Sequence, residues 1–476
     1  MKFLLSKHAV VSIWLAMGLA LVPVYLWESG GMQLSHVLLA VGFVAILTLR
    51  GFRLDLPGIL LTVLSFMMVL RDGYSAIHYA SFELVIPVFY GLFTWLAFVS
   101  MKTWLDDARS ARFLWLGLVA AEVVAVAGVL YFGYGATIGS DGAWRSVGTF
   151  NNPNQLGYFS VCMLSLVGLL YLRGVIGRLV LGCMLAGVVF LAVASLSKAA
   201  MLACAAGVMA IAFSLGWKRS RVVIGLVMVV AMAVALVVQY DSGALGDYKF
   251  VKRLQDIGTQ EDDSMAERGY SVLLDADASE FLMGFGSEGV RTIVGHELHS
   301  TVASYFANFG FLTGFLFVFF LLIWGRRLFY RDGFVGVMVA VFPPMLYGLT
   351  HNGSRFTIFW VLLALSMSGG GGVAGGGRQC CLIFVRLRSV VRNEYFPVSY
   401  ECGLSSRPAV AADAGARPAR LPGVGLGSRV VASTCRRIAR FRYRRGQLRD
   451  RCHRPQSTEG WHQFFQDLVA VVAETT

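Results

Sequence analysis

The chain has 476 residues, of which 57% are hydrophobic and 14% are charged, and its net charge is +13. Soluble domains carry about 25% charged residues, so this composition excludes a soluble, a disordered and a fibrous protein. Residues 1–368 contribute only +3 of the charge, whereas residues 369–476, with 17 Arg, no Lys and 7 acidic residues, contribute +10. Because the excess lies in the last quarter, the basic composition does not indicate a nucleic-acid-binding protein.

Apolar runs divide the first 368 residues into predicted membrane-spanning helices. A spanning helix needs about 20 mostly apolar residues. Helices are the expected structure because a backbone inside lipid must satisfy its own hydrogen bonds. The sequence therefore predicts an all-α polytopic membrane protein with about twelve transmembrane helices. The runs cover residues 8–27, 34–49, 56–70, 81–101, 113–132, 155–172, 179–196, 199–216, 222–239, 302–324, 334–350 and 355–368.

The charges between these runs predict the orientation. With the N-terminus inside, the inner loops hold 15 Lys and Arg, while the short outer loops hold only Arg71, Arg145, Lys198 and Arg355. The positive-inside rule then places both termini in the cytoplasm. The first run is followed by Tyr25, Leu26 and Trp27 rather than by a small-residue cleavage site, so we expect it to stay in place as a signal anchor.

Two segments differ from the rest. Residues 240–301 form a polar outer loop of about 60 residues, and long extramembrane loops are usually functional. Its part from Met265 to Leu274 has the alternation of an amphipathic helix lying on the membrane surface. Residues 369–476 are rich in Gly and Arg. They are either a disordered basic cytoplasmic extension resting on anionic lipid or the product of a shifted reading frame, and the exclusive use of Arg favours the shifted frame.

The first candidate site is the outer segment from Trp144 to Gly157. Its three Asn and Pro153 come directly before an apolar helix. Asn152 or Asn154 can cap that helix, whose positive end would face an anion. Arg145 adds a charge suited to bidentate phosphate contact. An ordinary capped loop with an interfacial Arg is the alternative.

The second candidate site spans the end of the large loop. Arg268 is followed by a glycine-rich run, Phe281 to Gly289, and then by His296, Glu297 and His299. The glycines lack the strand–turn–helix context of a dinucleotide site. A zinc site would need further ligands. One histidine could act as a general base, although histidines at the membrane boundary are often merely interfacial.

Further charges belong to the same predicted outer face. Lys198 follows Ser195-Leu196-Ser197, Arg291 lies in the large loop, and Arg355 closes a tight turn that begins at His351. These cations suit the binding of a diphosphate. They do not suit acyl transfer, which needs a nucleophile triad, or a two-metal site. Within the helices, Glu83 and Glu122 are candidate counter-ions for an Arg, and this role is favoured over a proton relay.

The chain resembles the bacterial O-antigen ligase and polysaccharide polymerase superfamily in three segments. The first is GTFNNPNQLG after Arg145, the second is Ser195-Leu196-Ser197-Lys198, and the third runs from Arg268 through FLMGFGSEG to His299 and NFGFLTG. The resemblance spans roughly residues 110–368. Two departures are Lys198, where the family usually has Arg, and Ser300, where many relatives have Asn after the histidine.

The resemblance implies a metal-independent membrane glycosyltransferase with a GT-C-like architecture in residues 1–368 and no cofactor. Arg145, Lys198 and Arg268 would hold the diphosphate of an undecaprenyl-diphosphate-linked glycan, and His299 would be the general base on an acceptor hydroxyl. Further candidate substrate-binding residues are Asn151, Asn154, Arg291, His296 and Arg355.

The same resemblance implies a bacterial inner-membrane protein whose site faces the periplasm. Its partners would be the lipid-linked donor, a glycan or lipid A-core acceptor and the bilayer, with a flippase and a chain-length regulator in the same pathway, and no nucleic acid. A polymerase is favoured over an O-antigen ligase, and a non-enzymatic flippase or exporter remains as the third alternative.

Overall fold

The computed structural model describes ten parts of the chain: residues 6–27, 32–51, 54–78, 85–132, 137–138, 144–215, 270, 272–273, 276–294 and 298–369. The chain divides into two compact units, Met1–Asn393 and Glu394–Thr476, and every described residue belongs to the first. The predicted boundary after residue 368 and the two interpretations of the tail therefore stay predictions.

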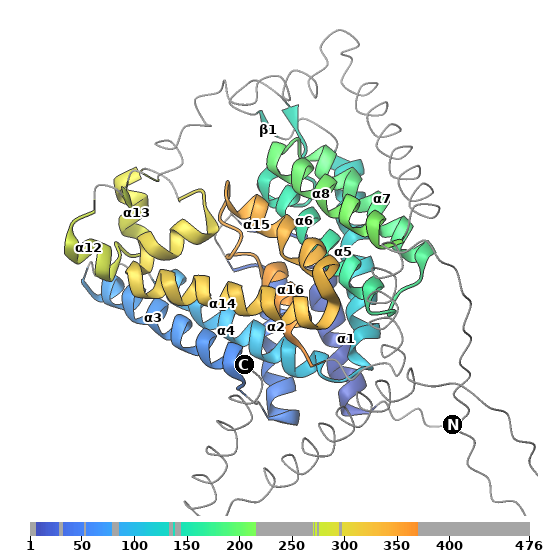
Figure 1. Cartoon of the computed structure of the whole chain (residues 1–476), viewed down its shortest axis with the longest axis horizontal. Coiled ribbons are helices and arrows are strands. Elements are labelled where there is room, and N and C mark those ends of the chain that lie inside the picture. Colours follow the sequence, from blue (N-terminus) through green and yellow to red (C-terminus); the bar gives the residue numbers. More distant parts are fainter. Residues whose placement is uncertain are drawn as a thin grey trace, which may run out of the picture. The chain divides into compact units, whose positions relative to one another are not determined.

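Five helices form the first half of the bundle (Figure 1). They are α1 (Lys7–Ala20), α2 (Leu34–Arg50), α3 (Leu56–His78), α4 (Val85–Leu105) and α5 (Ser110–Phe132). Helix α1 packs against α2 and α5, and α3 packs against α4. Gly18 of α1 faces Leu39 of α2, and Gly42 of α2 faces Leu15 of α1. Small residues at these positions let the two backbones approach closely, as is common between membrane helices.

The second half begins with a short strand pair and is organised around a buried helix. Its elements are β1 (Thr137–Ile138), β2 (Trp144–Arg145), α6 (Pro153–Leu172), α7 (Arg178–Ala194) and α8 (Lys198–Leu215). The two strands are antiparallel. Every residue of α6 from Gln155 to Leu170 is buried, because α7, α8 and the C-terminal helices surround it.

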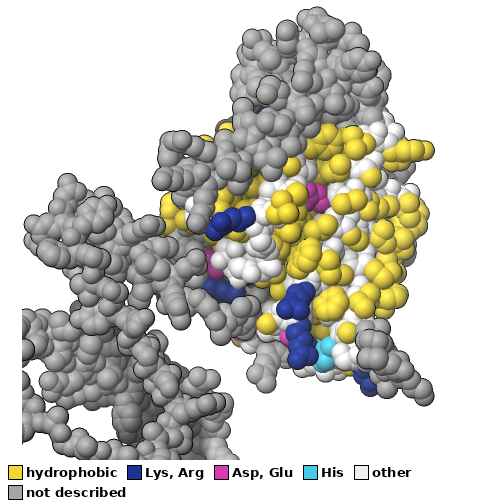
Figure 2. Space-filling view, turned by 90° about the vertical axis from the view of Figure 1, so that its right-hand side faces the viewer, with side chains coloured by type: hydrophobic (Ala, Val, Ile, Leu, Met, Phe, Trp, Pro, Cys, Tyr) yellow, Lys and Arg dark blue, Asp and Glu magenta, His cyan; other side chains and the backbone are white. Residues whose placement is uncertain are grey.

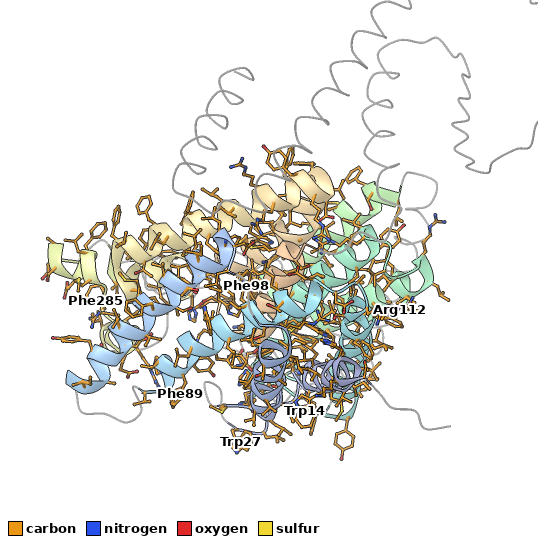
Figure 3. The ribbon with its side chains drawn as sticks, turned by 90° about the horizontal axis from the view of Figure 1, so that it is seen from below. Trp14, Trp27, Phe89, Phe98, Arg112 and Phe285 are labelled. Carbon is orange, nitrogen blue, oxygen red and sulfur yellow. The ribbon has the colours of Figure 1, made fainter. Side chains whose placement is uncertain are left out.

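The C-terminal part contains α12 (Ala278–Met283), α13 (Ser287–Val294), α14 (Thr301–Ala340), α15 (Phe342–Gly348) and α16 (Thr357–Met367). Non-helical backbone interrupts α14 at Gly310 and Gly333. Between these interruptions its Phe320 meets Phe98 of α4 at a ring-centroid distance of 5.7 Å. Figure 3 labels Phe98 among the side chains of the bundle.

The interruption at Gly310 makes room for the loop after α12. Gly310 has φ +80°, which favours glycine, and a Cβ there would overlap the carbonyl oxygen of Leu282. A helix end leaves its last carbonyls without intrahelical partners. Here the backbone N–H groups of Phe285 and Gly286 donate to the carbonyls of Ala307 and Asn308, both at 2.8 Å.

The described helices have the length and composition of a membrane protein. Six are long and apolar enough to cross a membrane, namely α3, α4, α5, α6, α8 and α14, and α1, α2, α7 and α16 are shorter apolar helices. Large hydrophobic side chains such as Leu130, Phe213 and Leu322 are exposed on the outside of the bundle. Figure 2 shows one such face, where hydrophobic side chains form a broad surface.

The predicted number of spans agrees with the structure only in part. The run at 222–239 and most of the large loop lie outside the described residues, and of the predicted amphipathic helix at 265–274 only residues 270 and 272–273 are described. The third run is longer than expected, because α3 continues to His78. The predicted single span at 334–350 is divided, since α14 ends at Ala340 and a short helix containing Pro343 and Pro344 follows. A proline cannot donate the backbone hydrogen bond that would continue the preceding helix.

Ion pairs join the helices at one end of the bundle. Asp55 contacts Lys102 at 3.0 Å and Arg327 at 2.6 Å, and Arg50 contacts Asp107 at 2.5 Å. These cations were predicted to lie in inner loops that are far apart in the sequence. Arg112, in the first turn of α5, and Phe285, in the loop before α13, are drawn on opposite sides of the ribbon in Figure 3.

A buried pair completes this cation-rich end. The Arg173 guanidinium binds the Asp332 carboxylate at 2.9 Å, and the two side chains are 10% and 8% exposed. Arg173 also donates to the carbonyls of Leu365, at 2.6 Å, and Ser366, at 3.3 Å. Arg331 donates to the carbonyl of Ser368. The last turn of α16 is therefore held by cations from α14 and the end of α6.

We expect the Asp55 ion pairs to stabilise the fold only when the carboxyl is ionised. Burial works to raise the pKa of Asp55, but hydrogen bonds and charges from Arg327 and Lys102 outweigh it and hold that pKa below its ordinary value. A lowered native pKa gives stability that is present above the ordinary value, about 3.9, and is lost as pH falls through the native pKa.

Asp55→Asn should therefore cost about 1 kcal/mol at neutral pH, and the difference should disappear in acid. Thermal unfolding of the purified protein in detergent between neutral and acidic pH measures this. Glu288→Gln, in the exposed part of α13, serves as a control and should run parallel to the unmodified chain. An Asp55→Asn deficit that is the same at every pH would contradict the assignment.

A second expectation concerns truncation. A chain that ends after Gly369 keeps every carbonyl that Arg173 and Arg331 bind, so its melting temperature in detergent should be unchanged. A chain that ends after Leu363 lacks Leu365, Ser366 and Ser368, and it should give little monodisperse protein on size-exclusion chromatography. Equal behaviour of the two truncated chains would contradict a structural role for these bonds.

Candidate functional site

The loop before α6 forms a capped helix start, as the sequence predicts. The Asn152 side chain accepts a hydrogen bond from the backbone N–H of Asn154 at 2.7 Å, and Pro153 begins the helix. Proline is tolerated there because its missing N–H would have no intrahelical partner. The Asn151 side chain donates to the carbonyl of Trp27 at 2.6 Å, so the loop is fixed to the chain between α1 and α2.

The segment before α8 packs directly on the start of α6. A Cβ at Gly157 would lie 3.1 Å from Ser195 Oγ and 3.0 Å from the Cβ of Ala200, so glycine permits this close approach. Leu196 has φ +49°, a left-handed conformation that is uncommon for a residue with a side chain. The Ser197 hydroxyl accepts from the N–H of Ala200 at 3.4 Å and caps α8, whose first residue is the partly buried Lys198.

His299 lies at the start of α14, next to a second histidine. Ser300 is the N-cap of α14, and its hydroxyl accepts from the N–H of Ala303 at 3.3 Å. The rings of His299 and His351 are 5.9 Å apart between centroids. Thr301 holds the turn that carries His351, because its hydroxyl donates to the His351 carbonyl at 3.0 Å and accepts from the N–H of Gly353 at 2.8 Å.

Tyr347 connects this histidine pair to the loop before α6. Its ring stacks on His351 at 4.7 Å between centroids and lies 4.9 Å from the ring of Tyr158. Its hydroxyl donates to the carbonyl of Asn154 at 2.7 Å. A continuous set of contacts therefore leads from His299 through His351 and Tyr347 to Asn154.

Four helix N-termini meet at this end of the bundle. Gly157 near the start of α6 touches the start of α8, and the Gly353 turn before α16 is bonded to the first residue of α14. The ring of Phe356, the N-cap of α16, lies 5.1 Å from that of Tyr158 in α6. Each N-terminus carries the partial positive charge of its helix dipole. Their assembly favours an anion at this place.

Two adjacent charged residues of α3 hold the glycine-rich loop. Arg71 was predicted to lie in a short outer loop but lies within the helix, and Asp72 was not indicated by the sequence. The Arg71 guanidinium donates to the carbonyl of Gly284 at 2.9 and 3.1 Å, and the Asp72 carboxylate accepts from the N–H and the hydroxyl of Ser287, both at 3.1 Å. Asp72 thereby caps α13 from another helix. Gly284 and Gly286 both have positive φ, a backbone conformation that favours glycine in this turn.

Arg355 lies at the same end, on the far side of the His351 turn. Its exposed guanidinium is 5.7 Å from the centre of the Tyr90 ring in α4. Burial raises the pKa of the Tyr25 phenol, and the charge of Arg355 partly opposes this increase. The charge of Arg355 therefore influences Tyr25, in the segment that follows α1.

Not every predicted site residue is found at this end of the bundle. Arg291 is exposed on α13, where its guanidinium lies 3.9 Å from the Glu288 carboxylate. Arg145 lies in β2, but its side chain is outside what the structure describes, and so are Arg268 and His296. Lys198, Asn151, Asn154, Arg355 and His299 belong to the same end of the bundle.

The described residues contain no group of three or more His, Cys, Asp and Glu side chains that could hold a metal ion. His299 and His351 would supply only two of the ligands that a zinc site needs. What this arrangement offers chemically is a pair of imidazoles beside a region that favours anions.

His351 and Tyr347 are the residues that sequence reasoning missed at this site. The turn from His351 to Arg355 was noticed only for its Arg. His351 is a second histidine on the same predicted face as His299, and this is the sequence feature that could have indicated its place in the site. Tyr347 gave none, because an aromatic residue in an apolar run is usually part of the core.

No protein-family model matches the chain, and a search of curated proteins found no relative. The fold by itself defines an α-helical membrane protein, with several helices long and apolar enough to span a bilayer.

Proposed function

We propose that the protein is a membrane glycosyltransferase that transfers a glycan from undecaprenyl diphosphate to an acceptor hydroxyl, in the manner of O-antigen polymerases and ligases. The observation that carries the proposal is the meeting of the three segments that resemble this superfamily. The loop before α6, the Ser195–Lys198 segment and His299 are far apart in the sequence, yet they lie at one end of the bundle.

The chemistry needs a place for the leaving group. In the proposed reaction the acceptor oxygen attacks the anomeric carbon, the bond from this carbon to the phosphate oxygen breaks, and the diphosphate leaves with the electron pair. Positive groups that face the developing charge stabilise such a transition state. The N-termini of α6 and α8, together with Lys198, Arg145 and Arg268, are the groups that we assign to this role.

The chemistry also needs a base for the proton of the hydroxyl. We assign it to His299, whose ring adjoins that of His351 at the start of α14. An imidazole is the side chain whose ordinary pKa, about 6.5, best suits proton transfer near neutral pH. No metal is required for either step, so the proposed enzyme is metal-independent.

We further propose an orientation. The ion-pair end of the bundle, with Arg50, Lys102 and Arg327, would face the cytoplasm, and the His299 end would face the periplasm of a bacterial inner membrane. The full span count and a GT-C-like architecture belong to this proposal. A single cysteine introduced into the loop 240–301, which has none of its own, should react with a membrane-impermeant thiol reagent added outside the cell, and labelling from the cytoplasmic side alone would overturn the orientation.

The identity of the acceptor distinguishes a polymerase from a ligase. We favour a polymerase, which would use a second lipid-linked repeat unit, over a ligase, which would use lipid A-core. The site residues are shared, and binding pockets set the specificity. In a deletion strain, loss of a polymerase leaves single repeats on the lipid A-core, whereas loss of a ligase leaves none.

Reconstitution tests the activity directly. The full chain in liposomes that contain a lipid-linked repeat unit should release undecaprenyl diphosphate and form longer glycans. A variant with neutral side chains at 145, 198, 268 and 299 should do neither. A folded quadruple variant that still builds normal surface glycan in cells would refute the proposed site, and movement of glycan across the membrane without transfer would identify a flippase instead.

A further inference from the structure

Glu122 is an acidic side chain in the middle of a membrane-spanning helix. It is the thirteenth of the 23 residues of α5, it is only 5% exposed, and its neighbours in the sequence from Val119 to Val126 are apolar. Ionisable residues at such depth are costly and therefore usually functional. The site proposed above does not use this residue.

Gly187 of α7 provides the space that the carboxyl group occupies. It is the tenth of 17 residues in α7, so it also lies near the middle of its helix. A Cβ at this position would overlap Glu122 Oε1, and any side chain larger than that of glycine would displace the carboxyl group. The Glu122 carboxyl group therefore lies at the interface between α5 and α7.

Among the described residues, Glu122 has no counter-ion in this interface. Its buried Oε2 atom has no hydrogen-bond partner among the described residues, so the predicted pairing with an Arg is not confirmed. The helices that pack against α5 are α1, α4, α6 and α7. The Lys, Arg and His residues of these helices and of α5 all lie in terminal turns. Besides Glu122, the basic and titratable residues of these helices are Lys7, His8, Tyr90, Lys102, Arg112, Tyr131, Tyr158, Cys162, Tyr171, Arg178 and Cys183.

We propose that Glu122, in the space left by Gly187, is a proton-binding site at the middle of the membrane-spanning region. An ionised carboxylate without a partner is very unfavourable in such surroundings, whereas the neutral acid carries no charge and can be accommodated. An apolar side chain would fill the same interface at no such cost, so a carboxyl group here indicates a role for the proton. The packed arrangement of α5 and α7 is the proton-bound state, and loss of the proton draws water to the carboxylate and loosens the two helices.

Infrared difference spectroscopy tests the protonation state. The spectrum of the full chain in lipid minus that of Glu122→Gln should show the C=O stretch of a protonated carboxylic acid at neutral pH, and this band should decrease as the pH is raised. Glu288→Gln is the matched control, because the exposed Glu288 should give a carboxylate band instead. A carboxylate band for Glu122 at neutral pH, or a band that does not respond to pH, would overturn the proposal.

A hydrophobic carbodiimide tests the unmodified chain if the Gln variant does not fold. The acid adds across one C=N bond of the reagent: its oxygen bonds to the central carbon and its proton moves to nitrogen. Acyl transfer to nitrogen then gives a stable acylurea with no leaving group. Mass spectrometry should find one reagent molecule on Glu122 at neutral pH and less at alkaline pH. Labelling confined to exposed carboxylates such as Glu288 would overturn the proposal.

Discussion

If the protein is the proposed transferase, His299→Ala should abolish glycan transfer while leaving the fold intact. A general base contributes about 100- to 10,000-fold to a rate, and no other group at the proposed site has been assigned to take the proton of the acceptor hydroxyl. The His299 side chain is only partly buried, so its loss should not disturb the core. The measurement is product formation in liposomes together with the distribution of glycan chain lengths in a complemented deletion strain.

Two comparisons distinguish catalysis from folding. His8→Ala changes a histidine at the opposite end of the bundle, where the His8 ring accepts from Arg50 at 3.3 Å, and it should retain activity. The His299→Ala protein should elute as the unmodified protein does on size-exclusion chromatography. A correctly folded His299→Ala variant with normal chain lengths would remove the base assignment, and it would favour a transporter in which this histidine is merely interfacial.

Asp332→Ala should cause the largest loss of stability among single substitutions of charged residues. It leaves the Arg173 guanidinium nearly buried without its carboxylate, and breaking a buried pair in this way costs about 3 kcal/mol or more. The loss should also loosen α16, because the same guanidinium binds two carbonyls at the end of that helix. The fraction of protein that stays monodisperse after heating in detergent measures the effect.

The double variant Arg173→Met, Asp332→Leu should be more stable than Asp332→Ala, since it leaves no unpaired buried charge. Breaking the exposed pair of α13 by Glu288→Ala is the matched control and should change stability by less than about 0.5 kcal/mol. Equal effects of Asp332→Ala and Glu288→Ala would show that the buried pair does not hold the cation-rich end together.

Much of the local structure could be predicted because local chemistry determines it. The apolar runs agree with the described helices to within a few residues at many of their ends, and the capped start of α6 follows from Asn152 and Pro153. The exceptions in the C-terminal part have backbone causes. Glycines with positive φ interrupt α14, and two prolines begin a separate helix where one span was expected.

The ion pairs at the cation-rich end illustrate a different kind of limit. The sequence indicated that Arg50, Lys102 and Arg327 share one side of the membrane, because each follows or precedes an apolar run. It did not indicate that Lys102 and Arg327 meet on Asp55. Such partners depend on the direction in which each helix leans, and this is a property of the packed bundle.

The sequence by itself determined that the protein belongs to the membrane and which loops collect positive charge, since hydrophobic length and backbone hydrogen bonding act segment by segment. Only the tertiary structure decided that His299 lies beside His351, that Tyr347 bonds to Asn154 from a position 193 residues away, and that Glu122 fills the space at Gly187. These contacts depend on which faces of distant helices pack together. No single segment carries that information.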